Sequence, residues 1–169
     1  VESLAKAYIA YQSRLEQDGL YDFADLIAGV IDGLDRDRML AQRLSQKFSH
    51  VMVDEYQDIN LAQHKFIERL LTSHRNIWVV GDDDQALYGW RGANVRFILD
   101  FEKNYPGAKV ARLEQNYRSQ ANILNFAGKI IAHNSGRFLK QFTPRREATS
   151  PVRIHIAANV DDEATWVAA

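Results

Sequence analysis

Three short polar clusters contain the residue types that phosphate chemistry requires. The first cluster, DEYQD at 54–58, directly follows the apolar run 51–53. A carboxylate at the end of a buried strand can bind a magnesium ion shared with nucleotide phosphates, and a neighbouring carboxylate can orient or deprotonate the attacking water. Asp54 and Glu55 are therefore candidate metal-binding and catalytic residues. The alternative is a solvated turn whose acidic side chains favour the amino end of the next helix.

The second cluster, GDDDQALYGWRGA at 81–93, follows another apolar run. Its three adjacent aspartates repel one another, and a turn of this composition usually faces solvent. Gln85 lies close to the strand end, where its amide can contact a terminal phosphate or the attacking water. Tyr88, Trp90 and Arg91 lie between glycines rather than on an apolar stripe. Flat rings beside a guanidinium are suited to stacking on unpaired bases and contacting a phosphate.

The third cluster, EQNYRS at 114–119, follows the segment KVARL at 109–113, which is predicted to form a strand. Tyr117 and Arg118 lie just before a predicted helix, where an aromatic face and a guanidinium can hold a base and a phosphate. The alternative is a capping turn that carries a surface arginine. Together the three clusters supply an acid pair, a glutamine and an arginine, which are the groups that phosphoryl transfer uses.

The hydrophobic pattern predicts the helices and strands that position these clusters. Apolar residues at helical spacing predict amphipathic helices, and Asp22, Asn60 and Ser119 are predicted to cap three of them. The predicted helices cover about 4–18, 22–34, 36–47, 60–71, 97–105, 119–133 and a final segment from 161.

Short apolar runs without alternation predict strands at 51–53 and 77–80, each buried on both faces of a parallel sheet, and a third strand is predicted at 109–113. Trp78 is accordingly predicted to lie in the core. The spacing of the runs suits strand–helix–strand units, so the fold class is α/β with an open parallel sheet. Ligands of such sheets bind beyond the carboxyl ends of the strands, where all three clusters begin. Alternation at 152–156 predicts a further strand, with one solvated face, after a basic linker at 136–151.

Composition excludes several classes of protein. The chain has 169 residues, 46% of them hydrophobic, and no cysteine, which excludes disulfides, zinc–thiolate sites and thiol catalysis. The formal charge of −1 means that nucleic-acid binding must depend on local patches. No apolar run approaches the ~18 residues of a membrane helix and no signal peptide is recognisable, so we expect a cytoplasmic protein. The first residue, Val1, and the short final helix suggest a piece of a longer protein.

Four segments resemble motifs of one protein family. VMVDEYQDIN, VVGDDDQALYGWRGAN and LEQNYRS are similar to successive signature motifs of the UvrD/Rep/PcrA-type superfamily 1 DNA helicases, and YDFADLI resembles the stretch that precedes them. The similarity extends from about Tyr8 to Asn134, in the same order and spacing. It implies a partial RecA-like parallel sheet flanked by helices, which is a P-loop NTPase fold. It also implies ATP-dependent 3′–5′ movement on single-stranded DNA in repair or replication restart.

The resemblance implies a role for each residue at the nucleotide site. Asp54, with Glu55, would bind Mg²⁺, and Glu55 would activate the hydrolytic water. Gln57 would bind near the nucleotide and link this site to the DNA track. Gln85 would sense the γ-phosphate of ATP.

The resemblance also implies roles for the residues that carry rings and guanidinium groups. Tyr117 would stack on adenine, and Arg118 would act as an arginine finger on the γ-phosphate. Tyr88, Trp90 and Arg91 would contact single-stranded DNA. Because Gln85 and the DNA-binding rings share one loop, hydrolysis would move Trp90 against a base.

The sequence departs from the family pattern in several places. Ile59 and Ala86 stand where the family usually has threonine and serine, and no GxxxxGK[ST] phosphate loop is present. The resemblance therefore implies three parts. These are the edge of an inserted helical subdomain at 1–20, the second half of the first motor domain at 21–135, and a linker with the start of the second motor domain at 136–169. The remaining motor domains of the parent chain would be its partners, and the isolated piece would hydrolyse ATP poorly.

The residues leave two other functions open. The parent protein could be the helicase subunit of a recombination helicase–nuclease, which a downstream nuclease domain would reveal. The chain could also be a single-stranded nucleic-acid binding module without ATPase activity, although intact Asp54, Glu55, Gln85 and Arg118 argue against a decayed motor.

Overall fold

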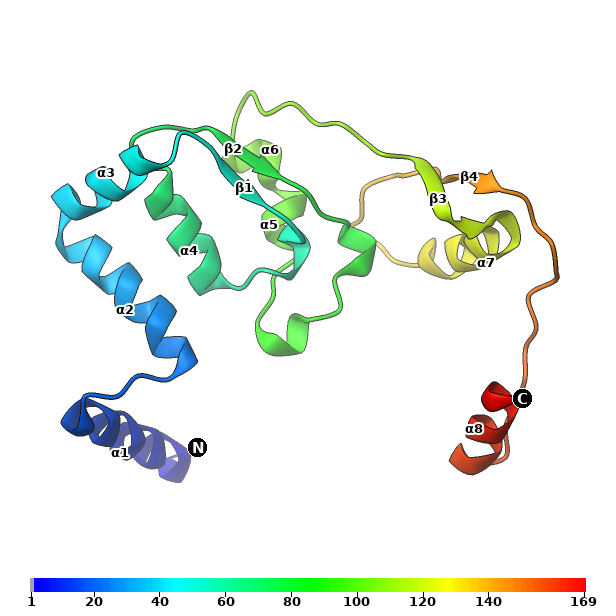
Figure 1. Ribbon diagram of the computed structural model, residues 1–169, viewed down its shortest axis with the longest axis horizontal. Helices are drawn as coiled ribbons and strands as arrows, with labels where there is room; N and C mark the ends of the chain where they lie inside the picture. The colour runs from blue at the N-terminus through cyan, green and yellow to red at the C-terminus, as the bar shows by residue number, and fades with distance from the viewer. Residues whose placement is uncertain (1) are drawn as a thin grey trace. The chain divides into compact units, whose positions relative to one another are not determined.

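The computed structural model describes residues 2–169 and divides the chain into two compact units. The first unit ends at Ala108 and the second runs from Lys109 to Ala169 (Figure 1). Each unit contains one pair of parallel strands with helices beside it. The predicted part boundaries at 20/21 and 135/136 stay predictions.

The first unit contains most of the helices. Asp22 and Asn60 cap α2 and α4 as predicted, since each side chain accepts a hydrogen bond from the backbone N–H three residues later. The predicted helix near 97–105 is two short helices, α5 and α6. The helices of this unit are α1 (Glu2–Asp18), α2 (Phe23–Arg36), α3 (Arg38–Lys47), α4 (Leu61–Leu70), α5 (Arg96–Leu99) and α6 (Phe101–Asn104).

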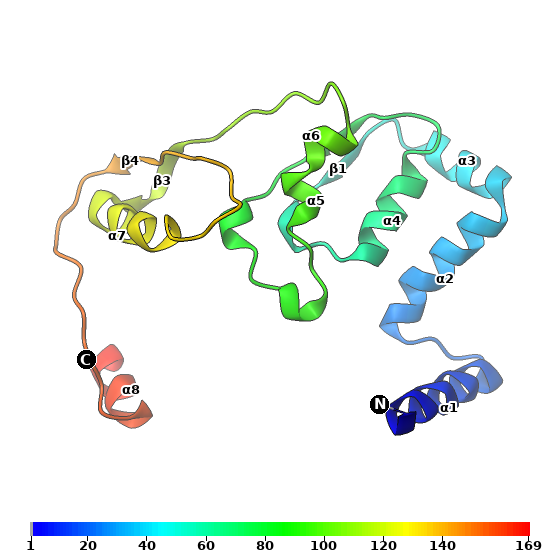
Figure 2. The same cartoon turned by 180° about the vertical axis from the view of Figure 1, so that it is seen from behind.

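The sheet of the first unit is a parallel pair formed by β1 (Val51–Val53) and β2 (Ile77–Val79). Helix α4 connects the two strands, as the spacing predicted, and both views show α4 and α5 beside them (Figure 1, Figure 2). The apolar side chains of the strands, α2, α4 and α5 form a small core. Its buried members include Ile31, Leu34, Val51, Tyr56, Ile59, Ile67, Leu71 and Ile98.

The prediction that these strands are buried on both faces was wrong. Met52 is 77% exposed and Trp78 is 66% exposed, although their neighbours along each strand are at least partly buried. The two residues are partners in the register of the sheet, so they lie on the same face. Among the described residues, helices cover only the other face, and the predicted core position of Trp78 was therefore also wrong.

The second unit contains β3 (Gln115–Gln120), α7 (Ala121–Ile131), β4 (Thr143–Arg146) and α8 (Val160–Ala168). Strands β3 and β4 are parallel. The predicted strand at 109–113 was wrong, because these residues have no regular structure and the strand begins at Gln115. Polar residues form β3 because β4 provides hydrogen-bonding partners, and tertiary pairing of this kind overrides weak strand propensity.

Three further predictions for this unit were wrong. Ser119 lies inside β3 and does not cap α7, which follows Gln120 without a side-chain cap. The segment predicted as a linker at 136–151 contains β4. The segment at 152–156, predicted as a strand, has no regular structure, since it has no strand partner among the described residues.

The predicted fold class is confirmed. Small parallel sheets flanked by helices make this an α/β chain, as expected of a partial RecA-like sheet. In the part of the chain that the structure describes, no helix combines the length and the hydropathy needed to cross a bilayer.

Candidate functional site

The first two polar clusters lie side by side at the carboxyl ends of β1 and β2. The N–H of Val80 donates to the carbonyl of Val53, and the N–H of Tyr56 donates to the carbonyl of Val80, each at 2.9 Å. These bonds continue the pairing of the strands into the loops that follow. The loops 54–58 and 81–85 are therefore neighbours, as parallel pairing at one sheet edge requires.

Glu55 has a strained backbone at the first of these loops. Its φ of 50° and ψ of 42° lie in the left-handed region, where no other non-glycine residue among those described is found. Such a conformation is uncommon for residues with a Cβ and is retained where neighbouring contacts fix it. Two contacts do so here. The Glu55 N–H donates to Asp54 Oδ1 at 2.9 Å, and Gln57 Nε2 donates to Glu55 Oε2 at 2.8 Å.

Gln57 is the buried centre of the site. The residue is almost completely buried, at 1% exposure, and both polar atoms of its side-chain amide are hydrogen-bonded. Nε2 donates to Glu55 Oε2 and, at 3.1 Å, to Asp58 Oδ2. Oε1 accepts the backbone N–H of Asp82 at 3.0 Å. One amide thus binds the carboxylates of the first loop to the backbone of the second.

Gly81 allows this approach. A Cβ at this position would lie 2.5 Å from Gln57 Oε1 and 2.8 Å from Ile98 Cδ1. Both distances are too short for non-bonded atoms, so only glycine fits without a shift of its neighbours. No role was predicted for Gly81 from the sequence, although its position directly after the strand was an available signal.

Asp82 extends the hydrogen bonds of Gln57 to Gln85. Asp82 Oδ2 accepts from Gln85 Nε2 at 2.7 Å, and the N–H of Gln85 donates to the carbonyl of Asp82 at 2.9 Å. A continuous path of hydrogen bonds therefore joins Glu55 to Gln85 through Gln57 and Asp82. From the sequence, Asp82 was predicted only to be one of three repelling charges, and its role in ordering this loop was missed.

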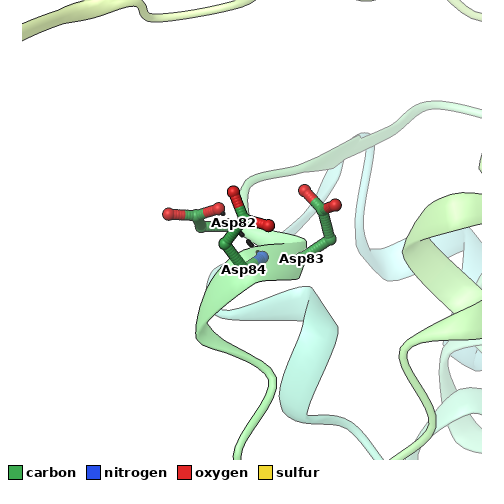
Figure 3. A group of neighbouring side chains, drawn as sticks. All are labelled: Asp82, Asp83 and Asp84. Atoms are coloured by element: carbon green, nitrogen blue, oxygen red, sulfur yellow. Dashed lines mark hydrogen bonds between the residues drawn. The ribbon is translucent and has the colours of Figure 1, made fainter. Parts of the chain in front are cut away.

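The aspartate cluster at the start of the second loop has a local structural role. Carboxylate oxygens of Asp82, Asp83 and Asp84 lie within 4.8 Å of one another (Figure 3). Asp82 Oδ1 accepts the N–H of Asp84 at 3.2 Å, which is the bond drawn in the figure, while its Oδ2 accepts from Gln85. Both carboxylate oxygens of Asp82 thus accept hydrogen bonds that stabilise the turn. These bonds are sufficient to explain why an aspartate stands at this position.

The aromatic segment 88–91, which follows the second loop, is exposed, and its side chains contact one another. Trp90 is 75% exposed and Tyr88 is 43% exposed. The Arg91 guanidinium carbon lies 4.6 Å from the centre of the Trp90 ring and 5.2 Å from that of Tyr88, in cation–π geometry. An exposed ring with a guanidinium on its face has the chemistry that binds unpaired bases.

Backbone contacts attach this aromatic segment to the end of the first loop. Asn60 and Ala93 form an isolated antiparallel bridge, and the N–H of Asn94 donates to the carbonyl of Ile59 at 3.1 Å. Ile59, at the end of the first loop, is buried. Its apolar side chain belongs to the core and leaves no polar group unsatisfied there.

Tyr56, although it belongs to the first cluster, is a core residue. It is completely buried, with its ring edge-on to Phe101 at a centroid distance of 5.7 Å. Burial raises the pKa of the Tyr56 hydroxyl far above its ordinary value, with smaller contributions from Tyr105 and Glu68, so the group stays neutral. Its hydroxyl lies 3.3 Å from His64 Nδ1.

Tyr117 and Arg118 belong to the second unit, where both lie exposed on β3. The Tyr117 hydroxyl donates to Gln115 Oε1 at 2.9 Å. Asn116 Oδ1 accepts the N–H groups of Arg118 and Ser119 at 3.0 and 2.8 Å, which forms a tight turn within the strand. An ordered backbone thus presents one ring and one guanidinium to solvent.

The first loop has the chemistry that a magnesium ion requires. Asp54 is the first residue after β1, and its exposed carboxylate accepts one backbone N–H. Glu55 is also exposed, and only its Oε2 is hydrogen-bonded among the described residues. Hard carboxylate oxygens with uncommitted lone pairs suit Mg²⁺, which keeps several water ligands and needs few from protein.

Comparisons with known proteins agree with the motifs. A family model described as the UvrD/REP helicase N-terminal domain matches residues 1–106, and one described as the UvrD-like helicase C-terminal domain matches residues 111–169. The chain is similar to DNA helicase II of Haemophilus influenzae, with 45% identity over 96% of this chain. It is also similar to the ATP-dependent DNA helicases PcrA of Leuconostoc citreum and Staphylococcus epidermidis, with 42% and 41% identity over 98% of this chain. The chain spans 22–23% of the length of these curated relatives.

Proposed function

Because the chain belongs to the UvrD/REP helicase family, we propose that it forms part of an ATP-dependent DNA helicase. In this proposal the full-length protein is cytoplasmic and couples Mg-ATP hydrolysis to 3′–5′ movement on single-stranded DNA, in repair or replication restart. The observation that carries the proposal is the path from Glu55 through Gln57 and Asp82 to Gln85. This path joins two loops of phosphate-binding character into one hydrogen-bonded unit.

Asp54 and Glu55 form the hydrolytic part of the proposed site. Asp54, with Glu55, would hold Mg²⁺, which when bound neutralises charge on the phosphate oxygens. Gln57 holds Glu55 Oε2, and this leaves Oε1 to orient the attacking water and to accept its proton. The strained backbone of Glu55 supports this role, because strain of this kind gathers at functional sites.

The rest of the nucleotide site comes from other parts of the protein. Gln85 senses the γ-phosphate, Tyr117 stacks on adenine, and Arg118 stabilises the charge that develops on the γ-phosphate. The chain contains no GxxxxGK[ST] loop, so the remaining motor domains would supply the phosphate cradle. We propose that residues 1–20, 21–135 and 136–169 are the three parts implied by the motifs.

The DNA site lies on the same loop as the phosphate sensor. Gln85 and Trp90 are five residues apart, and Tyr88 lies between them. A shift of Gln85 when the γ-phosphate leaves would therefore move the rings against a stacked base. The exposure of Trp90 and the guanidinium of Arg91 beside it support this assignment.

The decisive test is Glu55→Gln in the full-length protein. We expect kcat for DNA-stimulated ATP hydrolysis to fall by roughly 10²- to 10⁴-fold, because the amide cannot accept the proton of water. Binding of ATP and of single-stranded DNA should persist, since the two side chains have the same shape. ATP turnover and fluorescence anisotropy of labelled oligonucleotide measure the two properties.

Glu102→Gln is the matched control, because Glu102 is an exposed carboxylate on α6 outside both loops. It should retain wild-type turnover. Wild-type turnover by Glu55→Gln itself would contradict the catalytic assignment. A full-length wild-type protein that binds DNA without hydrolysing ATP would instead favour the binding-module alternative.

A further inference from the structure

The pairing of β3 with β4 is irregular at Arg118. Asn116 is opposite Pro144 and Gln120 is opposite Arg146, so four steps along β3 correspond to two along β4. Residues 117–119 therefore bulge out of the ladder. Bulges turn side chains to new directions and leave backbone groups without ladder partners.

Side chains replace the missing partners within this bulge. Asn116 Oδ1 accepts the N–H groups of Arg118 and Ser119. Arg146 Nη1 donates to the carbonyl oxygen of Arg118 at 3.1 Å. The bond comes from a charged donor, so it is stronger than a neutral hydrogen bond.

Contacts on both sides hold Arg146 in register with the bulge. Before it, the N–H of Thr143 donates to the carbonyl of Glu114 at 2.8 Å. After it, Gln120 Nε2 donates to Thr149 Oγ1 at 2.9 Å, and the N–H of Thr149 donates to Gln120 Oε1 at 3.2 Å. Residues 143–149 thus form a strap along β3, and Arg146 lies between its two fixed ends.

We infer that Arg146 is a positioning residue for Arg118, because its guanidinium fixes the Arg118 carbonyl at the bulge. A fixed carbonyl restricts the rotation of the peptide that carries the Arg118 side chain, and so restricts the direction in which that side chain leaves the strand. The inference rests on the proposed function, in which Arg118 contacts the γ-phosphate. In this role Arg146 acts through Arg118 and not on the nucleotide directly.

The test uses Arg146→Met in the full-length protein, which removes the donors and the charge but keeps an apolar stem. We expect kcat for ATP hydrolysis to fall by roughly 3- to 10-fold, as the loss of one orienting hydrogen bond implies, while KM for ATP changes by less than about twofold. Arg145→Met is the matched control. Arg145 is the exposed neighbour on β4, and among the described residues it makes no hydrogen bond to Arg118.

Testing Arg146→Met in a protein that also carries Arg118→Ala separates a positioning role from a general loss of structure. In Arg118→Ala, where no guanidinium remains to be positioned, Arg146→Met should lower the residual rate no further. An additive loss in the double variant, or equal kinetics of Arg146→Met and Arg145→Met, would overturn the inference.

The outcomes also distinguish this inference from the proposed function. If Arg118→Ala alone hydrolyses ATP at the wild-type rate, the proposed role of Arg118 fails. If Arg118→Ala is inactive and Arg146→Met is indistinguishable from wild type, the proposed function stands and only the positioning role is rejected.

Discussion

Gly81 is the residue at which the geometry of the candidate site is most tightly constrained. Its hydrogen faces Gln57 Oε1, Ile98 Cδ1 and the backbone nitrogen of Tyr56, in a space where a methyl group would meet all three. Because Gln57 is buried and holds Glu55, a shift at Gly81 would be transmitted to the carboxylate. The chemistry proposed for Glu55 therefore depends on a residue that has no side chain.

We predict that Gly81→Ala loosens both loops. The added Cβ must displace Gln57 or Ile98, and overpacking of this kind costs about 1–3 kcal/mol. Hydrogen–deuterium exchange of the full-length protein should then be faster at the amides of Tyr56 and Asp82, which donate to Val80 and to Gln57.

Gly33→Ala provides the control for this substitution. Gly33 lies on α2, where an added Cβ has nothing within 4 Å, and alanine is the better helix former. Exchange in the two loops should be unchanged in this variant. If Gly81→Ala leaves exchange at Tyr56 and Asp82 as slow as in wild type, the close approach to Gln57 is not a constraint.

At the scale of elements, the start of α4 has two functions. Asn60 and Gln63 exchange side-chain and backbone hydrogen bonds, each at 2.9 Å, and this capping box starts the helix that connects β1 to β2. Asn60 also forms the bridge to Ala93, just after the exposed ring of Trp90. One residue thus begins a helix and anchors the aromatic segment.

We predict that Asn60→Ala weakens the first turn of α4 by about 0.5–2 kcal/mol, because the N–H of Gln63 loses its acceptor. Exchange at the amide of Gln63 in the full-length protein would report this loss. Asn60→Asp should preserve protection, since aspartate caps helices as well as asparagine. Equal protection in the alanine and aspartate variants would show that the cap contributes nothing measurable.

At the scale of the whole molecule, the chain spans 22–23% of the length of its relatives. Its two units each carry part of the residue set proposed for ATP hydrolysis. The first unit holds Glu55 and Gln85, and the second holds Arg118. The proposed ATP hydrolysis therefore uses residues of both units, and its measurement belongs to the full-length protein.

We predict that Trp90→Ala weakens binding of single-stranded DNA by the full-length protein. One base–aromatic stack contributes about 1–3 kcal/mol, so affinity should fall by roughly 5- to 150-fold. Trp90→Phe keeps a flat ring and should retain most of the affinity. Anisotropy titrations at one fixed salt concentration compare the variants, and unchanged affinity in Trp90→Ala would remove this ring from the DNA site.

The sequence by itself determined what is local. The caps at Asp22 and Asn60, the helices that follow them, and the strands that begin at Val51 and Ile77 were predicted because periodicity and capping act between residues a few positions apart. The chemical character of the three clusters was also evident from residue types alone.

Only the tertiary structure decided which distant residues meet. The bridge from Gln57 to Asp82 spans 25 positions, and the bond from Arg146 to Arg118 spans 28. The polar strand at 115–120 forms because β4 pairs with it, whereas the segment 109–113 has no strand partner among the described residues. Hydrogen bonds and steric contacts between segments far apart in the chain leave no periodic signal, so pattern reasoning cannot detect them.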